Sequence, residues 1–162
     1  MRHVGIGFED PNVFHSAGAS GVASVGDTQA VTTLTRTGDR QDFGSTVAVG
    51  DINGDGYADV VVGAIGNVEQ TAFVFYSAGS AGVMSADDVQ AGATLSGTIA
   101  NEGFAMSVGV GDLDGDGYAD VAVGADGHAY IFQSTGSSGI PSASETAATA
   151  TLSGVLAYSL AL

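Results

Sequence analysis

Short runs of apolar residues alternate with glycine-rich or acidic turns along the whole chain. Val60, Val61 and Val62 are apolar at consecutive positions, which indicates a strand that is covered on both faces. Asp126-Gly127, between two such runs, is typical of a tight hairpin. Long helical patterns are absent from the sequence. The pattern predicts an all-β chain in which short strands are joined by tight turns.

The chain also repeats itself. Asp51 recurs as Asp112, and Phe43 recurs as Phe104, each 61 residues later. Residues 74–79 match residues 13–18 with the same offset. Residues 131–134 match residues 74–77 with an offset of 57. Self-similarity on this scale is typical of solenoids, propellers and arrays.

Each repeat unit predicts four short strands, which we call A to D in chain order. In the two complete units they are expected at 43–50, 58–64, 72–77 and 94–96, and at 104–111, 119–125, 129–134 and 151–153. A third unit is split between the ends of the chain, with B, C and D at 4–7, 13–16 and 31–36 and A at 156–162. Four antiparallel strands per unit, stacked face to face, predict a β-propeller. The single domain, 1–162, then divides into 1–42, 43–97, 98–154 and 155–162.

Twelve expected strands make three blades, whereas propellers typically have about 4–8 blades. We therefore expect self-association, in which the C-terminal A strand of one molecule pairs with the N-terminal strands of another. Two chains would complete a six-bladed homodimer without exposed edges. Two alternatives stay open: the chain is a piece of a longer propeller, or strand donation continues into a filament.

The charge balance narrows the range of partners. The chain has 18 acidic residues, three arginines and no lysine, for a net charge of −15. This excess argues against binding nucleic acid and against docking on anionic membranes. With 44% hydrophobic residues the chain is not a disordered acidic tail, and without cysteine it has no disulfide or thiolate metal site. The apolar segment 155–162 is too short to span a bilayer and no signal-peptide pattern follows Met1, so we expect a soluble chain.

Seven of the carboxylates lie in two loops, residues 51–59 and 112–120, which share the template D-x-D/N-x-D-G-x-x-D. Calcium is a hard cation that binds about 6–8 oxygen atoms, so carboxylates at alternate loop positions are suitable ligands. Metal-free acidic turns are the alternative, but crowded carboxylates repel one another unless a cation lies among them. We predict two Ca²⁺ ions per chain, with position seven contributing a backbone carbonyl. The predicted ligands are Asp51, Asn53, Asp55, Tyr57 and Asp59 in the first loop, and Asp112, Asp114, Asp116, Tyr118 and Asp120 in the second.

Position twelve separates these loops from EF-hands, because Val62 and Val123 stand where an EF-hand has its bidentate glutamate. The flanking segments are also predicted strands rather than helices. The acidic loops between their predicted strands resemble the FG-GAP repeat of integrin α-type propellers. The motif elements are Phe43-Gly44 with Gly63-Ala64-Ile65 in one copy, and Phe104-Ala105 with Gly124-Ala125-Asp126 in the other. Ile65 and Asp126 replace the usual proline, and Ala105 replaces the glycine.

The resemblance implies calcium-binding blades and a non-catalytic module that recognises or adheres to a protein or glycan, outside the cell or at its surface. A structural subunit that builds a ring or filament by strand exchange is the alternative function. An enzyme is the third hypothesis, but the residues favour it least. His3, His15 and His128 are scattered, and no nucleophile-elbow motif is present.

Overall fold

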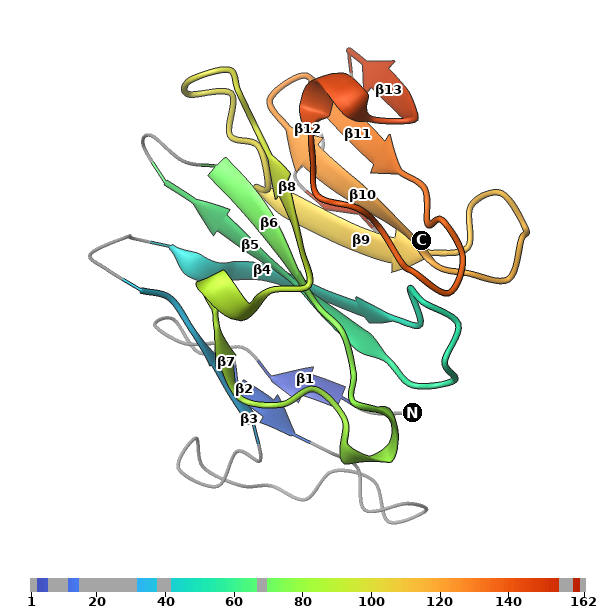
Figure 1. The fold of residues 1–162 in the computed structure, drawn as a ribbon. Helices are drawn as coiled ribbons and strands as arrows, with labels where there is room; N and C mark the ends of the chain where they lie inside the picture. The colour runs from blue at the N-terminus through green and yellow to red at the C-terminus, as the bar shows by residue number, and fades with distance from the viewer. Residues whose placement is uncertain are drawn as a thin grey trace.

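The computed structural model describes residues 3–5, 12–14, 32–37, 42–66, 70–154 and 159–160. Within these residues the chain forms three sheets and no α-helix (Figure 1). The three sheets lie side by side, with the middle sheet between the other two (Figure 1). The expectation of an all-β fold is confirmed.

The sheets follow the predicted repeat units, and we call them the N-terminal, middle and C-terminal blades. The N-terminal blade contains β1 (His3–Gly5), β2 (Asn12–Phe14) and β3 (Thr32–Thr35). The middle blade contains β4 (Phe43–Gly50), β5 (Asp59–Ile65), β6 (Gln70–Phe75) and β8 (Ala93–Ser96). The C-terminal blade contains β9 (Ser107–Gly111), β10 (Asp120–Ala125), β11 (His128–Phe132) and β13 (Ala150–Ser153). Within each blade, strands that follow one another in this order pair antiparallel.

The core lies between the blades, because the middle sheet packs one face against each of the other two sheets. Along β5, Val60 and Val62 join the cluster toward the N-terminal blade, whereas Val61 joins the cluster toward the C-terminal blade. Successive side chains of a strand point to opposite faces, so this division follows directly from the pleat. The run of three valines is therefore covered on both sides, as the sequence predicted.

The inner strand of the C-terminal blade is shorter than expected, since β9 begins at Ser107 rather than at Phe104. Gly103 and Ala105 have φ angles of 67° and 68°, so the chain turns on either side of Phe104 before the strand starts. Phe104 is fully buried there, with its ring centroid 5.7 Å from that of Tyr130. In the middle blade the same region is a bulge of β4 between Phe43 and Thr46.

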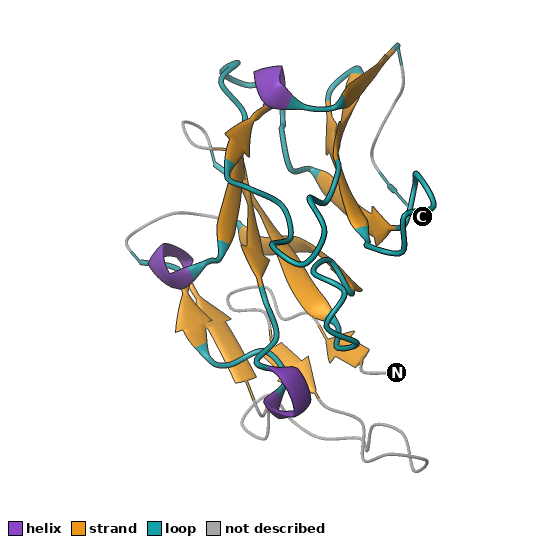
Figure 2. Ribbon diagram, turned by 45° about the vertical axis from the view of Figure 1, so that its right-hand side comes forward, coloured by secondary structure: helices purple, strands orange, loops and turns teal. Residues whose placement is uncertain are grey.

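Two short strands were not expected. β7 (Ala86–Asp87) and β12 (Ala143–Ser144) lie in the segments between the third and fourth strands, where the repeat pattern predicts no strand. β7 pairs parallel with β3, and β12 pairs parallel with β8, so each linker extends the outer edge of the preceding blade. The 3₁₀ turns η4 (Asp88–Gln90) and η5 (Glu145–Ala147) follow them, and η3 (Gly79–Ala81) precedes β7 (Figure 2).

The split unit is described only in part. β1, β2 and β3 overlap the ranges 4–7, 13–16 and 31–36 that were predicted for its B, C and D strands. The A strand predicted at 156–162 falls outside the described residues except for Ser159 and Leu160, so that strand stays a prediction. No helix in the described part of the chain is long and apolar enough to cross a membrane.

Candidate metal centre

The two acidic loops connect the first and second strands of their blades. Residues 51–58 join β4 to β5, and residues 112–119 join β9 to β10. Both loops lie on the same side of the molecule (Figure 1). Each turns through two glycines with positive φ, Gly54 and Gly56 in one loop and Gly115 and Gly117 in the other. Left-handed backbone at these positions favours glycine and wraps the loop around its own acidic side chains.

In the first loop, Asp51 organises the turn and leaves one oxygen without a donor. Its Oδ2 accepts the backbone N–H of Gly56 at 2.8 Å. Its Oδ1 is buried and accepts no hydrogen bond from the described residues. Asn53 Oδ1 accepts the N–H of Asp55 at 3.1 Å, and Asp55 Oδ1 accepts the N–H of Tyr57 at 2.8 Å. A buried carboxylate oxygen with no donor is costly, so this atom indicates a missing cationic partner.

The second loop brings three carboxylates together. One oxygen from each of Asp112, Asp114 and Asp116 lies within 4.8 Å of the others, and all three residues are exposed. Asp112 Oδ1 accepts the N–H groups of Gly115 and Asp116, at 2.7 and 3.1 Å. The backbone thus holds like charges close together, an arrangement that a divalent cation relieves.

The ninth positions, Asp59 and Asp120, have a different environment from the rest of the predicted ligands. Both are buried, and both oxygens of each accept backbone N–H groups. Asp59 bonds to Ile52 and Ser77 at 2.9 and 2.8 Å, and Asp120 bonds to Leu113 and Ser134 at 3.0 and 2.9 Å. Burial raises the pKa of the Asp59 carboxyl, although the hydrogen bonds from Ser77 and Ile52 oppose that effect.

These two carboxylates therefore fasten each loop to the end of the third strand of its blade. Asp120 is not among the three clustered carboxylates of its loop. Its oxygens keep lone pairs that remain available after one hydrogen bond each. The sequence template alone gave no sign of this structural role, because the serine that completes it lies 14 residues away in one blade and 18 in the other.

The tyrosines at position seven also do more than offer a carbonyl. Tyr118 donates its N–H to Asp116 Oδ1 at 2.9 Å, as Tyr57 does in its loop. The Tyr118 ring lies against the first loop, so that a Cβ at Gly54 would be only 2.4 Å from its Cε1. Gly54 therefore serves two purposes, the left-handed turn and the space for a ring from the next blade. The two loops are in contact through this ring.

The donor set fits calcium. All candidate ligands are oxygens, the loops are closed by backbone hydrogen bonds, and the first loop holds an unpartnered buried oxygen. The residues that would hold an ion are Asp51, Asn53 and Asp55 in the first loop and Asp112, Asp114 and Asp116 in the second, with Tyr57, Tyr118, Asp59 and Asp120 adjoining them.

Comparison with known proteins matches the same two segments. The FG-GAP repeat family matches residues 43–83 and 104–140, each of which begins at a buried phenylalanine and contains one acidic loop. The chain carries two FG-GAP repeats.

Integrin α chains are among the relatives of these FG-GAP repeats. Integrin alpha-4 of Xenopus laevis is 35% identical over 106 residues, which is 56% of this chain and 9% of that protein. Integrin alpha pat-2 of Caenorhabditis briggsae is 41% identical over 85 residues, which is 50% of this chain and 7% of that protein. Integrin alpha-M of Mus musculus is 37% identical over 95 residues, which is 56% of this chain and 8% of that protein. The match spans less than a tenth of the length of each of these relatives.

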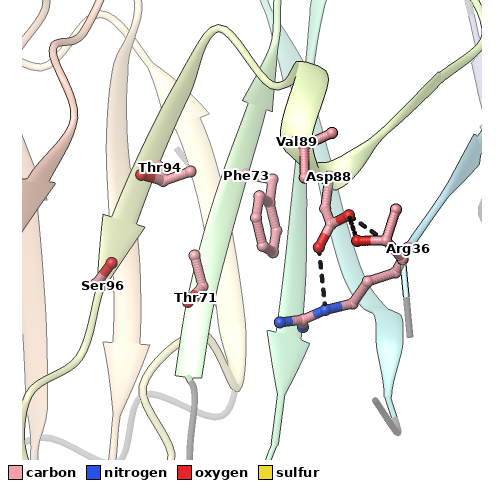
Figure 3. Close-up of a pocket in the computed structure, with 8 residues that line it drawn as sticks. Arg36, Thr71, Phe73, Asp88, Val89, Thr94 and Ser96 are labelled. Atoms are coloured by element: carbon pink, nitrogen blue, oxygen red, sulfur yellow. Dashed lines mark hydrogen bonds and ion pairs between the residues drawn. The ribbon is translucent and has the colours of Figure 1, made fainter. Parts of the chain in front are cut away.

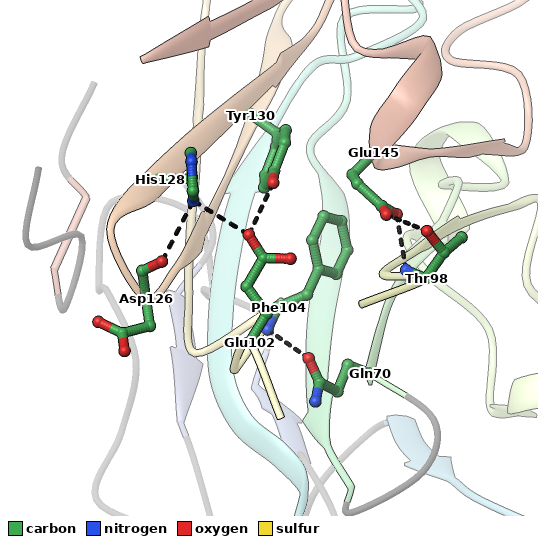
Figure 4. Close-up of polar contacts among 8 residues, drawn as sticks. All are labelled: Gln70, Thr98, Glu102, Phe104, Asp126, His128, Tyr130 and Glu145. Carbon is green, nitrogen blue, oxygen red and sulfur yellow. Dashed lines mark hydrogen bonds and ion pairs between the residues drawn. The ribbon is translucent and has the colours of Figure 1, made fainter. Parts of the chain in front are cut away.

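A second polar cluster surrounds Glu102 beside the hairpin that joins β10 to β11, at the other end of these strands from the acidic loop (Figure 4). Its Oε1 accepts the Tyr130 hydroxyl at 2.8 Å and lies 3.0 Å from His128 Nδ1. Burial and the bond to Glu102 raise the pKa of Tyr130 to about 12. Asp126 donates its N–H to the Glu102 carbonyl at 2.7 Å, so the cluster joins the segment before β9 to the hairpin between β10 and β11. His128 is the first residue of β11.

A groove of about 340 Å³ lies where the N-terminal and middle blades meet (Figure 3). Arg36 and Asp88 line it, with Nε 3.4 Å from Oδ2, and the guanidinium carbon lies 5.3 Å from the centroid of the Phe73 ring. Thr37 donates both its N–H and its hydroxyl to Asp88 Oδ1, at 2.9 and 2.8 Å. These side chains bond to one another between the two blades, so the groove is part of the contact that holds the N-terminal and middle blades together.

Proposed function

We propose that this chain is a calcium-stabilised, non-catalytic propeller module that recognises or adheres to a protein or glycan outside the cell. The observation that supports it is the pair of acidic loops, each placed between the inner strands of an FG-GAP repeat. Buried Asp51 Oδ1 and the clustered carboxylates of the second loop supply the oxygen donors that calcium prefers.

The proposed role of calcium is structural. Each loop binds backbone N–H groups with the same carboxylates that would face the ion, so an ion there stiffens the corner between two strands. Affinities of about 10⁻⁴–10⁻³ M are typical of extracellular calcium modules and would suit this role. The integrin relatives also favour a position at the cell surface or outside the cell.

The first test is calcium titration of the purified chain by calorimetry, with thermal unfolding measured in calcium and in chelator. Two sites are expected. An ion at about a hundred times its dissociation constant adds about 2.7 kcal/mol of stability per site, so chelator should lower the melting temperature by several degrees. The double variant Asp51→Asn with Asp112→Asn should lose most of this difference. A matched control, Asp42→Asn with Asp126→Asn, changes two exposed acids outside the loops and should keep it.

Ligand recognition needs its own assay. Protein and glycan arrays probed in calcium and in chelator should detect binding only when calcium is present, and a hydrolysis screen of the same ligands should be negative. Turnover of any of them would overturn the non-catalytic proposal. The alternative function, a structural subunit of a ring or filament, is separated by electron microscopy of the chain alone. Filaments would favour the structural subunit, whereas compact discs would favour the recognition module.

A further inference from the structure

The outer edges of two blades have a partner strand of the same kind, and the outer edge of the third has none among the described residues. β3 is extended by β7 from the middle blade, and β8 is extended by β12 from the C-terminal blade. β13 pairs with β11 on one side, and no described segment pairs with its other side. Unpaired edges of this kind are templates for another strand.

The apolar face beside β13 shows the same difference. Leu95 of β8 is fully buried, whereas Leu152, its equivalent in β13, is 54% exposed. Ile52 in the first acidic loop is fully buried, whereas Leu113, its equivalent in the second, is 45% exposed. We call Leu113, Leu152 and the free edge of β13 the open face. In the middle blade this face is covered by the C-terminal blade, which indicates that the open face is shaped for a further blade.

The contacts that cover an outer edge follow a pattern that can be read residue by residue. Ser85 and Ser142 accept the N–H groups of Thr33 and Thr94 through their hydroxyls, at 3.1 and 3.0 Å. The residue after each serine, an alanine, pairs with the buried leucine of the outer strand. Two residues further, Asp88 and Glu145 accept the backbone and hydroxyl of Thr37 and Thr98. The apolar residue two positions before the serine, Val83 or Ile140, is buried against the preceding blade.

The sequence holds a third copy of this pattern. Residues 82–88 read Gly-Val-Met-Ser-Ala-Asp-Asp, residues 139–145 read Gly-Ile-Pro-Ser-Ala-Ser-Glu, and residues 21–27 read Gly-Val-Ala-Ser-Val-Gly-Asp. The glycine, the apolar residue, the serine and the acid coincide in all three. Segments 82–88 and 139–145 already occupy the outer edges of β3 and β8, and segment 21–27 lies outside the described residues.

We propose that the open face binds segment 21–27 of a second copy of this chain. By the sequence match, Val25 stands where Ala86 and Ala143 pair with the outer leucine, and Ser24 stands where Ser85 and Ser142 accept the N–H of the residue before that leucine. Val22 stands where Val83 and Ile140 are buried against the preceding blade. The contact joins the last complete blade of one molecule to the N-terminal blade of the next. It adds an outer-strand interface to the exchange of inner strands expected from the sequence. Asp27 stands where Asp88 and Glu145 stand, although position 155 is valine where 37 and 98 are threonine.

The test is the oligomeric state of the full chain by sedimentation velocity over a series of concentrations. The wild-type chain should self-associate, and Leu152→Asp should raise the dissociation constant about a hundredfold or more, as expected for a charge in the centre of an interface. Val89→Asp is the matched control, since Val89 is 75% exposed on the middle blade, and it should associate like the wild type. A monomeric wild type, or normal association of Leu152→Asp, overturns the inference.

A mixing experiment tests that the two faces meet. Val25→Asp alone should also be monomeric, yet a mixture of the Leu152→Asp and Val25→Asp chains keeps one intact pair of faces and should associate. Absence of association in the mixture, with both variants folded by circular dichroism, contradicts the pairing. Should either variant unfold, hydrogen exchange of the wild type decides instead: amides 150–153 must become protected as concentration rises. All measurements are run in calcium and in chelator, which separates failure of this interface from failure of the calcium proposal.

Discussion

The third position of the acidic loops differs between the two repeats, with Asn53 in the first and Asp114 in the second. Calcium affinity in such loops depends on the number of charged ligands, so the second loop should bind more tightly. Asn53→Asp is expected to strengthen the first site about tenfold, and Asp114→Asn to weaken the second by a similar factor, each equivalent to about 1.4 kcal/mol. Calorimetric titration of the two variants measures both changes. Equal affinities in all three proteins would contradict a carboxylate ligand at this position.

At the residue level, the sequence predicted the positions of the two loops, because that signal is local. Both acidic segments form loops between the predicted strands, because alternate acids with glycines at fixed positions specify a turn without help from distant residues. Calcium ligation by their side chains stays a prediction. The loop template did not show that Asp59 and Asp120 are buried hydrogen-bond acceptors for Ser77 and Ser134, since those partners lie on another strand. The Tyr118 ring against Gly54 was missed for the same reason.

At the level of elements, the carboxylates that join adjacent blades should contribute measurable stability. Glu145 is buried and accepts both the N–H and the hydroxyl of Thr98. Thr98→Val removes the hydroxyl and leaves a buried carboxylate with one donor fewer, which should cost about 1–3 kcal/mol. Denaturant unfolding of the variant measures this loss. Thr94→Val is the control, because the backbone N–H of Thr94, rather than its hydroxyl, bonds to Ser142. Equal loss in both variants would argue against the role of Glu145.

The strands that sequence analysis predicted are those with an apolar run or a repeated register. Eleven of the twelve predicted strands are present in the described part of the chain, with three to eight residues each, and the hairpins between them follow from the repeat. β7 and β12 have two residues each and lie among serine, alanine and glycine, so they carry no periodic signal of their own. Their parallel pairing depends on the neighbouring blade, which propensity along one segment does not describe.

For the whole molecule, the question is whether copies joined through the open face close into a ring. The contact joins two different faces, so it gives a closed ring only if the rotation from copy to copy closes, and otherwise a filament. Two copies with three blades each would fall within the range of about 4–8 blades that propellers use. We therefore expect the mass to reach a plateau at two chains as concentration rises.

Net charge sets the conditions under which this plateau should appear. Each chain carries a formal charge of −15, so two copies repel each other at low ionic strength. Added sodium chloride screens this repulsion, and calcium in the loops reduces the charge itself. In chelator the dissociation constant should fall as salt rises, and calcium should lower it further at constant ionic strength. Light scattering that shows mass growing beyond two chains under these conditions would replace the ring by a filament while retaining the interface.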